Sequence, residues 1–219
     1  MTLRVGLTGG LASGKTTVAE MFASRGAHVM YADKIGHELM EPHQPVHEEV
    51  VRRFGDSIVN SDSRINRSKL AEIAFGSGRI EELNRIVHPA VVERLERWME
   101  EVGEFDPRAV LVFEAALILE AGLGKYFDRL VVVTSQPQQK LERFAARTVA
   151  GVPDDATHST ALREAERRIG VQLSDAEKIA AADYLIDNSG TLTETERQVN
   201  KIYKELQQLA AGKRSETLS

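Results

Sequence analysis

The segment Gly9-Gly10-Leu11-Ala12-Ser13-Gly14-Lys15-Thr16 has the residue types and spacing of a phosphate-binding loop. It fits the pattern G-x-x-x-x-G-K-[ST], in which the glycines let successive backbone N–H groups point at phosphate oxygens. Lys15 would supply a mobile positive charge for the β- and γ-phosphates, and the hydroxyl of Thr16 can bind Mg²⁺. The segment therefore predicts a purine-nucleotide site. The alternative is a chance glycine turn before a core helix.

Two carboxylates that follow apolar segments are candidates for chemistry beside the phosphates. Asp33 comes just after His28–Tyr31, and the carboxyl end of a parallel strand faces the ligand crevice. There Asp33 could orient an accepting hydroxyl and take its proton. Glu114 follows Ala109–Phe113. At the end of that strand its carboxylate would lie near Mg²⁺ or its waters. The alternatives are that Asp33 is the N-cap of a helix running to Leu39 and that Glu114 is an exposed acid at a strand end.

Five short apolar segments are expected to form the strands that position these residues. Their apolarity is continuous rather than alternating, which is typical of strands buried on both faces of a parallel sheet. Helical stretches separate them, so the pattern predicts an α/β fold with right-handed crossovers. The expected strands are Leu3–Leu7, His28–Tyr31, Ala109–Phe113, Arg129–Thr134 and Tyr184–Ile186, and the helices include Lys15–Ser24, Glu81–Val102, Gln138–Arg147 and Thr193–Leu209.

Two stretches break the alternation of strands and helices. The region from about 34 to 105 is helical and polar with no convincing strand, which predicts a helical subdomain inserted between the second and third strands. The stretch Thr148–Thr160 contains Gly151 and Pro153, two helix breakers, and predicts a mobile loop inside a helical pair. We therefore expect a single domain over 1–219, with a substrate-binding subdomain over 34–105 and a lid over 143–175.

Composition and charge exclude several classes of protein. The 28 Lys and Arg residues against 33 Asp and Glu give a net charge of −5, which argues against a protein that mainly coats nucleic acid. The chain has no cysteine, so disulfides, thiolate nucleophiles and Cys-ligated metals are excluded. No apolar run approaches the ~18 residues of a membrane span, and Thr8-Gly9-Gly10 interrupts the apolar N-terminus. We expect a cytoplasmic protein, monomeric rather than stably oligomeric, with neither nucleic-acid nor membrane partners.

Among nucleotide-binding proteins, a small-molecule kinase fits best. The chain has no N-K-x-D segment to read guanine and no L-S-G-G-Q transporter signature, and its D-x-x-G match at Asp187–Gly190 follows the last strand. A lid and an inserted helical region suit a kinase, because closure keeps water from taking the phosphoryl group. Two alternatives stay open: a nucleoside or nucleotide kinase on the same fold, and a nucleotide-binding regulator without catalysis. The carboxylates of Asp33 and Glu114 count against the regulator.

Five segments, in order and spread along most of the chain, resemble the dephospho-CoA kinase family. The phosphate loop alone is unspecific, but the five together are far more specific. They are the loop from Leu7 to Thr17; Ala32-Asp33, similar to the family's D-A-D; His88-Pro89, which matches its H-P pair; Glu114 with Leu117-Ile118-Leu119-Glu120, similar to D-x-P-L-L-x-E; and Gln172, Lys178, Ala182-Asp183-Tyr184 and Ile186–Gly190, similar to its ending Q…K…A-D-x-V-I-D-N-x-G.

The resemblance implies a P-loop kinase-type three-layer fold, a five-stranded parallel sheet flanked by helices. It implies transfer of the γ-phosphoryl of ATP, with Mg²⁺, to the ribose 3′-hydroxyl of dephospho-CoA, the last step of coenzyme A biosynthesis. By position, Asp33 is the proton acceptor, Lys15 is catalytic, and His88 and Glu114 lie with Asp33 on the substrate side. Thr16 would bind the metal. ATP would be held by Gly9, Ala12, Ser13, Gly14, Lys15, Thr16, Thr17, Arg143, Arg147 and Asn188, the last of them beside the adenine.

The sequence departs from the family pattern at three places. Tyr31 stands where the family usually has its first Asp, which we interpret as tuning, since Asp33 is retained. Ala116 replaces a Pro, which changes the shape of that loop but removes no reactive group. The stretch from Arg147 to Gln172 is long and is interpreted as a lid insertion. Any of Arg143, Arg147, Arg163, Arg167 and Arg168 could then meet the phosphates, and the last three could instead form a solvated helix face with Glu164 and Glu166.

Overall fold

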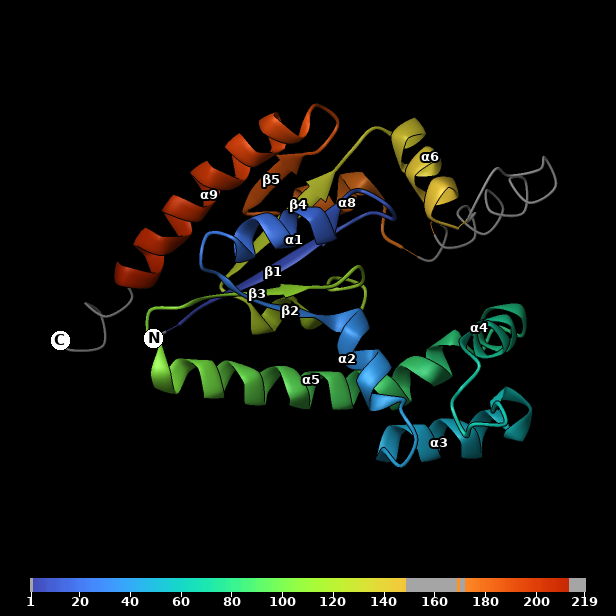
Figure 1. Ribbon diagram of the computed structural model, residues 1–219. Coiled ribbons are helices and arrows are strands. Elements are labelled where there is room, and N and C mark those ends of the chain that lie inside the picture. Colours follow the sequence, from blue (N-terminus) through green and yellow to red (C-terminus); the bar gives the residue numbers. More distant parts are fainter. Residues whose placement is uncertain (1, 149–168, 170–171, 213–219) are drawn as a thin grey trace. The chain divides into compact units, whose positions relative to one another are not determined.

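A computed structural model describes residues 2–148, 169 and 172–212 of the chain (Figure 1). Contacts between Cα atoms divide it into two compact units, Met1–Met30 with Val102–Ser219, and Tyr31–Glu101. The expected lid over 143–175 falls largely outside the described residues, and so do Arg163, Arg167 and Arg168. Their assignments stay predictions.

A five-stranded parallel sheet with strand order β2-β3-β1-β4-β5 forms the centre of the first unit. Strand β1 (Leu3–Gly9) lies in the middle, between β3 (Val110–Glu114) and β4 (Arg129–Thr134). Strand β4 pairs in parallel with β5 (Tyr184–Asp187) at one edge, and β2 (His28–Tyr31) forms the other edge. The five expected strands are confirmed, with ends that differ by at most two residues. The phosphate loop leaves the carboxyl end of the central strand.

Burial separates the central strands from the edge strands. All five residues of β3 are buried, as are six of the seven residues of β1 and the four inner residues of β4. In β2 and β5 only one residue each is buried, and Leu185 is exposed. The expectation that all five strands are buried on both faces is therefore wrong for β2 and β5, because a strand at the rim of a sheet has fewer neighbours to cover it.

Helices flank the sheet (Figure 1). Helix α1 (Lys15–Ala23) and helix α9 (Leu192–Gly212) pack against each other and against the sheet, with the rings of Phe22 and Tyr203 6.2 Å apart between centroids. The apolar side chains of Val199, Ile202 and Leu206 on α9 are all buried. The unit also contains η2 (Leu123–Tyr126, a 3-10 helix), α6 (Pro137–Thr148) and α8 (Asp175–Ala180). No helix within the described ranges is both long and apolar enough to cross a membrane.

The second unit is helical and has its own apolar core. It contains α2 (Ala32–Leu39), α3 (Pro45–Phe54), the 3-10 helix η1 (Asp56–Ile58), α4 (Arg67–Gly76) and most of α5 (Ile80–Phe105), which continues through Pro89. Its extended pairing is a single antiparallel bridge between Val59 and Ile65. The composition of this region thus indicated its helices correctly, while its role in binding substrate stays a prediction. The buried side chains of its core are Val46, Val50, Phe54, Ile58, Ile65, Leu70 and Ala74.

Candidate nucleotide site

The phosphate loop has a backbone that only small residues allow. Gly9, Ala12 and Gly14 have positive φ angles of 155°, 54° and 96°. A Cβ atom at Gly9 would overlap the carbonyl oxygen of Val133 on β4, and one at Gly14 would overlap the side-chain nitrogen of Asn188. Ala12 adopts the left-handed region without being a glycine, a local strain that is common at ligand sites. The two motif glycines are therefore required both by φ and by the close approach of neighbouring segments.

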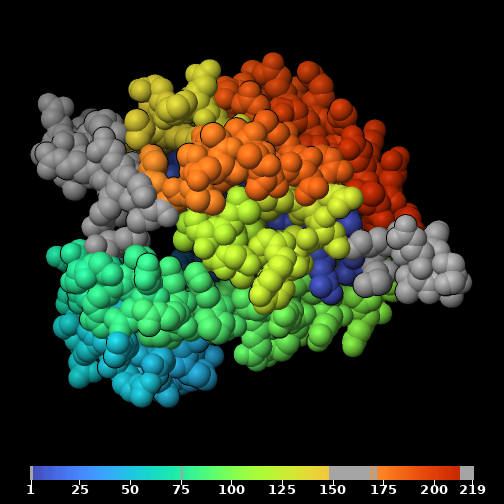
Figure 2. Space-filling view, turned by 180° about the vertical axis from the view of Figure 1, so that it is seen from behind, coloured from blue at the N-terminus to red at the C-terminus, as the bar shows by residue number. Residues whose placement is uncertain are grey.

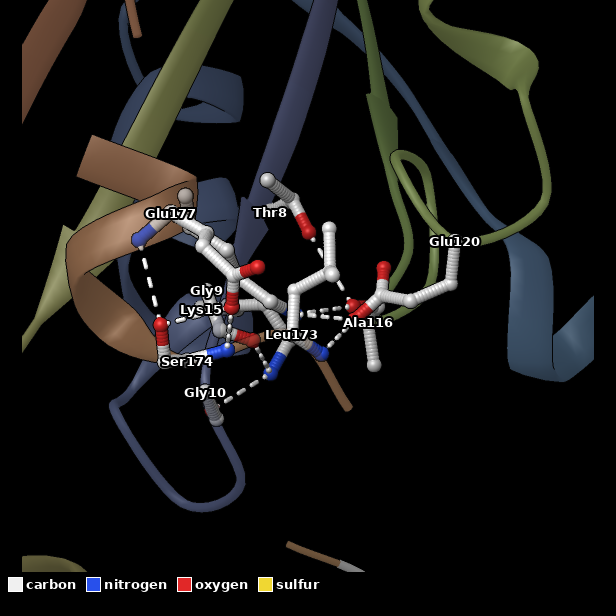
Figure 3. A network of polar contacts seen from close by, with 10 residues as sticks. Thr8, Gly9, Gly10, Lys15, Ala116, Glu120, Leu173, Ser174 and Glu177 are labelled. Carbon is white, nitrogen blue, oxygen red and sulfur yellow. Dashed lines mark hydrogen bonds and ion pairs between the residues drawn. The ribbon is translucent and has the colours of Figure 1, made fainter. Parts of the chain in front are cut away.

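Lys15, the first residue of α1, reaches back across the loop. Its ammonium donates hydrogen bonds to the carbonyl oxygens of Gly9 at 3.1 Å and Gly10 at 3.0 Å (Figure 3). These two bonds set the direction of a long and otherwise flexible side chain. The positive charge is thus held at the loop, where an anion bound by the loop's N–H groups would meet it.

Asn188 connects the loop to the far end of the chain. Its side-chain nitrogen donates to the carbonyl oxygen of Ser13 at 2.9 Å, and its side-chain oxygen accepts from the hydroxyl of Thr195 at 2.9 Å. Its backbone N–H donates to Thr134 at the end of β4. Asn188 is buried, so both ends of its amide have protein partners. The position beside adenine stays a prediction, and the contacts show Asn188 as a support of the loop.

Arg143 on α6 lies at the same corner of the unit. Its Nη2 donates to the backbone oxygen of Asn188 at 3.0 Å. Its Nη1 is buried, has no hydrogen-bond partner among the described residues, and lies 4.0 Å from the position of a Cβ on Gly14. A buried guanidinium nitrogen without a partner beside a phosphate loop is suited to bind an anion. Arg147, one turn further along α6, is exposed.

The segment that follows β3 packs beside the loop. Glu114 is 6% exposed and has partners, so the alternative of an exposed strand-end acid is wrong. The backbone oxygen of Ala116 accepts from the Thr8 hydroxyl at 3.2 Å (Figure 3). It also accepts from the Lys178 ammonium at 2.9 Å. Ala116 acts here through its carbonyl group, which a proline would also have. The departure from the family's Pro therefore keeps these two hydrogen bonds.

Asp33 and His88, the expected base and acceptor-site histidine, belong to the second unit. Helix α2 begins at Ala32 with Tyr31 as its N-cap, so Asp33 lies in the first turn and its side chain is exposed. The alternative that Asp33 is the N-cap is wrong. His88 lies on α5, where burial lowers its pKa below the ordinary value of 6.5. The catalytic role of Asp33 and the substrate role of His88 stay predictions.

Three residues that contact the loop or its support Asn188 were missed by sequence reasoning. Thr195 donates to the side-chain oxygen of Asn188, while Lys140 and Asp175 form an ion pair at Gly10. The signal for Lys140 was its spacing, because it precedes the buried Phe144 by four residues and so shares the buried face of α6. Asp175 follows Ser174, whose hydroxyl and backbone form a capping box with Glu177 that begins α8. The same bonds from Ser174 lower the pKa of Glu177.

The described residues contain no cluster of three or more histidines and carboxylates that could hold a metal ion. Such clusters suit metals that the protein alone surrounds, whereas Mg²⁺ in kinases takes one or two protein ligands and completes its shell with water and substrate phosphates. Lys15 and Arg143 thus give the loop two cationic groups suited to an anion, and a Mg²⁺ ion would come with the phosphates that it binds.

The central-strand phosphate loop, the lysine held over it and the sheet order β2-β3-β1-β4-β5 define a protein of the P-loop kinase class. The family model for dephospho-CoA kinase matches residues 3–194. A dephospho-CoA kinase from Leifsonia xyli is 39% identical over 201 residues, which cover 91% of this chain and 96% of that protein. One from Aquifex aeolicus is 38% identical over 204 residues, with 93% and 97% covered. The chain belongs to the dephospho-CoA kinase family, which confirms the resemblance carried by the five segments.

Solved structures agree with this assignment. A Thermus thermophilus protein superposes with a TM-score of 0.73 at 28% identity, covering 94% of this chain and 98% of that one. A dephospho-CoA kinase from Campylobacter jejuni gives a TM-score of 0.67 over 95% of this chain and 98% of its own. At 22% identity the second comparison shows a shared fold.

Proposed function

We propose that this chain transfers the γ-phosphoryl group of ATP to the ribose 3′-hydroxyl of dephospho-CoA, producing coenzyme A and ADP. The observation that carries the proposal is the phosphate loop with the Lys15 ammonium directed across it by Gly9 and Gly10, in a member of this family. The partner is a small molecule. In our proposal the protein works as a cytoplasmic monomer, with neither nucleic-acid nor membrane partners, and its net charge of −5 supports the absence of nucleic acid.

In the proposed reaction the ribose oxygen attacks the γ-phosphorus while the bond from that phosphorus to the β,γ-bridging oxygen breaks. The hydroxyl proton goes to the carboxylate of Asp33, and the electron pair of the broken bond leaves with ADP. Lys15, the loop N–H groups and the Nη1 of Arg143 neutralise charge on the phosphates. The protein forms no covalent bond, so its work is alignment and electrostatics.

The proposal includes Mg²⁺ bound with ATP. Thr16 is exposed at the start of α1, and its hydroxyl is the side chain that would hold the ion, while the buried Glu114 at the end of β3 would accept from its waters. Such an ion neutralises phosphate charge in phosphoryl transfer. One hydroxyl and one carboxylate suit an ion that keeps several waters.

An acceptor panel tests the function directly. The protein is incubated with ATP, Mg²⁺ and either dephospho-CoA, a nucleoside, a nucleoside monophosphate or no acceptor, and ADP is measured. Of the four samples, we expect only the one that contains dephospho-CoA to form ADP. A preference for a nucleoside or its monophosphate would replace the proposal by the other kinase, and an absence of acceptor-dependent ADP would favour a regulator.

The role of Asp33 is tested by Asp33→Asn. Loss of a general base lowers the rate by at least ~10²-fold, while the affinity for ATP stays within about twofold. Glu38→Gln is the matched control, because it removes an exposed carboxylate from the same helix. Near-normal turnover of Asp33→Asn would remove Asp33 from the mechanism.

A further inference from the structure

An ion pair with a buried lysine, which the proposed mechanism does not use, lies against the phosphate loop. Lys140 on α6 is 7% exposed, and its ammonium pairs with the carboxylate of Asp175, the first residue of α8. Figure 2 shows α8 (orange) at the surface between α6 (yellow) and the segment that follows β3 (yellow-green). The pair therefore joins two helices of the first unit beside the nucleotide site.

Both members of the pair meet the loop at Gly10. A Cβ atom on Gly10 would lie 2.8 Å from the Oδ1 of Asp175 and 3.0 Å from the Nζ of Lys140. The carbonyl oxygen of the same residue accepts from Lys15 at 3.0 Å. Two ammonium groups and one carboxylate thus converge on a single residue of the loop. A side chain at Gly10 would have to shift the ends of both members of the pair.

The two partners differ in their access to water. The side chain of Lys140 is 9% exposed, and that of Asp175 is 37% exposed. A buried ammonium needs an anionic partner, whereas a half-exposed carboxylate is partly solvated. Together they add no net charge to the loop. An anion bound by the loop would be attracted by Lys140 and repelled by Asp175, because both side chains meet the loop at Gly10.

We propose that Lys140 is an additional cation of the nucleotide site and that Asp175 limits the affinity it provides. The proposal rests on the proposed function, because it takes the loop to hold the phosphates of ATP and ADP. Lys15 attracts the phosphates in full, while the charge of Lys140 is attenuated by a carboxylate in direct contact with it. Asp175 is therefore an affinity-setting residue, and its removal leaves both substrate and product nucleotide bound more tightly.

Calorimetric titration with ATP and with ADP, each with Mg²⁺ at 50 and 300 mM salt, tests this. Asp175→Asn removes one negative charge and keeps an oxygen that accepts from Lys140, so we expect about three- to tenfold tighter binding and a steeper salt dependence. Lys140→Met leaves the carboxylate facing the phosphates, and we expect weaker binding by a similar factor, more for ATP than for ADP. The double variant is expected within about twofold of the unchanged protein.

Two further variants guard against effects on folding. Asp175→Glu keeps the charge and should keep the affinity within about twofold. Glu142→Gln makes the same change in net charge at an exposed position of α6, where Glu142 accepts from Gln138, and should leave the affinity unchanged. Thermal unfolding of each variant verifies that it is folded at the titration temperature.

The outcomes separate the two proposals. If the unchanged protein phosphorylates dephospho-CoA but Asp175→Asn binds nucleotides no better than Glu142→Gln, this inference is overturned and the proposed function stands. If the unchanged protein binds neither ATP nor ADP, the proposed function is overturned, and this inference falls with it.

Discussion

The side-chain nitrogen of Asn188 donates a 2.9 Å hydrogen bond to the carbonyl oxygen of Ser13, 175 positions earlier in the chain. The other end of that amide accepts from Thr195 on α9, and the backbone N–H of Asn188 donates to the end of β4. The phosphate loop is therefore tied to the residue that follows β5 and, through it, to α9 and β4, all in the C-terminal half of the chain. Its shape depends on residues that come long after its own motif.

Removal of the Asn188 amide should loosen the loop. Asn188→Ala leaves the Ser13 carbonyl and the Thr195 hydroxyl without this partner in a buried place, which costs about 1–3 kcal/mol of unfolding free energy. Affinity for ADP should fall by about tenfold. Asn188→Asp keeps the acceptor for Thr195 but places a negative charge against the Ser13 carbonyl. We expect this substitution to lower the ADP affinity more strongly than it lowers the free energy of unfolding. Urea unfolding and ADP titration measure the two effects.

Gln198→Ala is the control for this prediction. Gln198 also lies on α9 and bonds the backbone of Asp187, next to Asn188, yet it has no hydrogen bond to the loop. Its loss should leave ADP affinity unchanged. Wild-type affinity in Asn188→Ala would mean that the loop holds its shape without this anchor.

Gly14→Ala tests the backbone of the loop itself. The φ of 96° disfavours any side chain, and the new Cβ would collide with the Asn188 amide. We expect a loss of about 2–3 kcal/mol in unfolding free energy and at least tenfold weaker ADP binding.

Gly36→Ala is the control for this prediction. Gly36 lies inside α2, and the space around its Cβ position is open to 4 Å, so alanine there should stabilise the protein by about 0.5–1 kcal/mol. Equal effects of the two substitutions would contradict the argument.

The strands and the loop were predictable because each is encoded by neighbouring residues. The apolar runs of β1, β3 and β4 are continuous because both faces of these strands are buried, and that property is visible in any short window. The motif from Gly9 to Thr16 is equally local. Edge strands carry the same residue types as central strands, so the sequence could not predict that Leu185 on β5 is exposed.

The long-range contacts of the site were not predictable from local pattern. Lys140 and Asp175 are 35 positions apart, and Lys178 and Ala116 are 62 apart. A lysine on a helix face is usually solvated, and its partner depends on how separate helices pack against the sheet. The carbonyl of Ala116 has no side-chain signal at all. Such contacts depend on how distant elements pack together, and no rule of residue spacing in a single sequence predicts that packing.

Lys178 should contribute strongly to stability. Its ammonium is fully buried and pairs with Glu120 at 2.9 Å, and Glu120 also accepts from the backbone of Leu173. Lys178→Met leaves a mostly buried carboxylate without its cation, so we expect a loss of about 3 kcal/mol in unfolding free energy. The double variant Lys178→Met with Glu120→Leu should lose less than the sum of the single variants. Urea unfolding measures all three.

Lys204→Met, at an exposed position of α9, is the control and should change the unfolding free energy by less than about 0.5 kcal/mol. A cost for Lys178→Met as small as this would show that the buried pair contributes little. Additive single variants would show that Lys178 and Glu120 act independently.

The pH dependence of stability should report on His88. Burial lowers its pKa in the folded protein below the ordinary value of 6.5, so below that pH the unfolded chain binds more protons than the folded one. The unfolding free energy then rises with pH: the contribution of neutral His88 is complete above about 6.5 and is lost as the pH falls toward the lowered folded value. The slope from this one proton is at most about 1.4 kcal/mol per pH unit.

Two histidine variants test the assignment. His88→Gln should flatten the dependence of the unfolding free energy on pH, whereas His43→Asn, at an exposed position of the same unit, should not. Parallel profiles of His88→Gln and the unchanged protein between pH 5 and 7, measured by urea unfolding, would contradict the assignment.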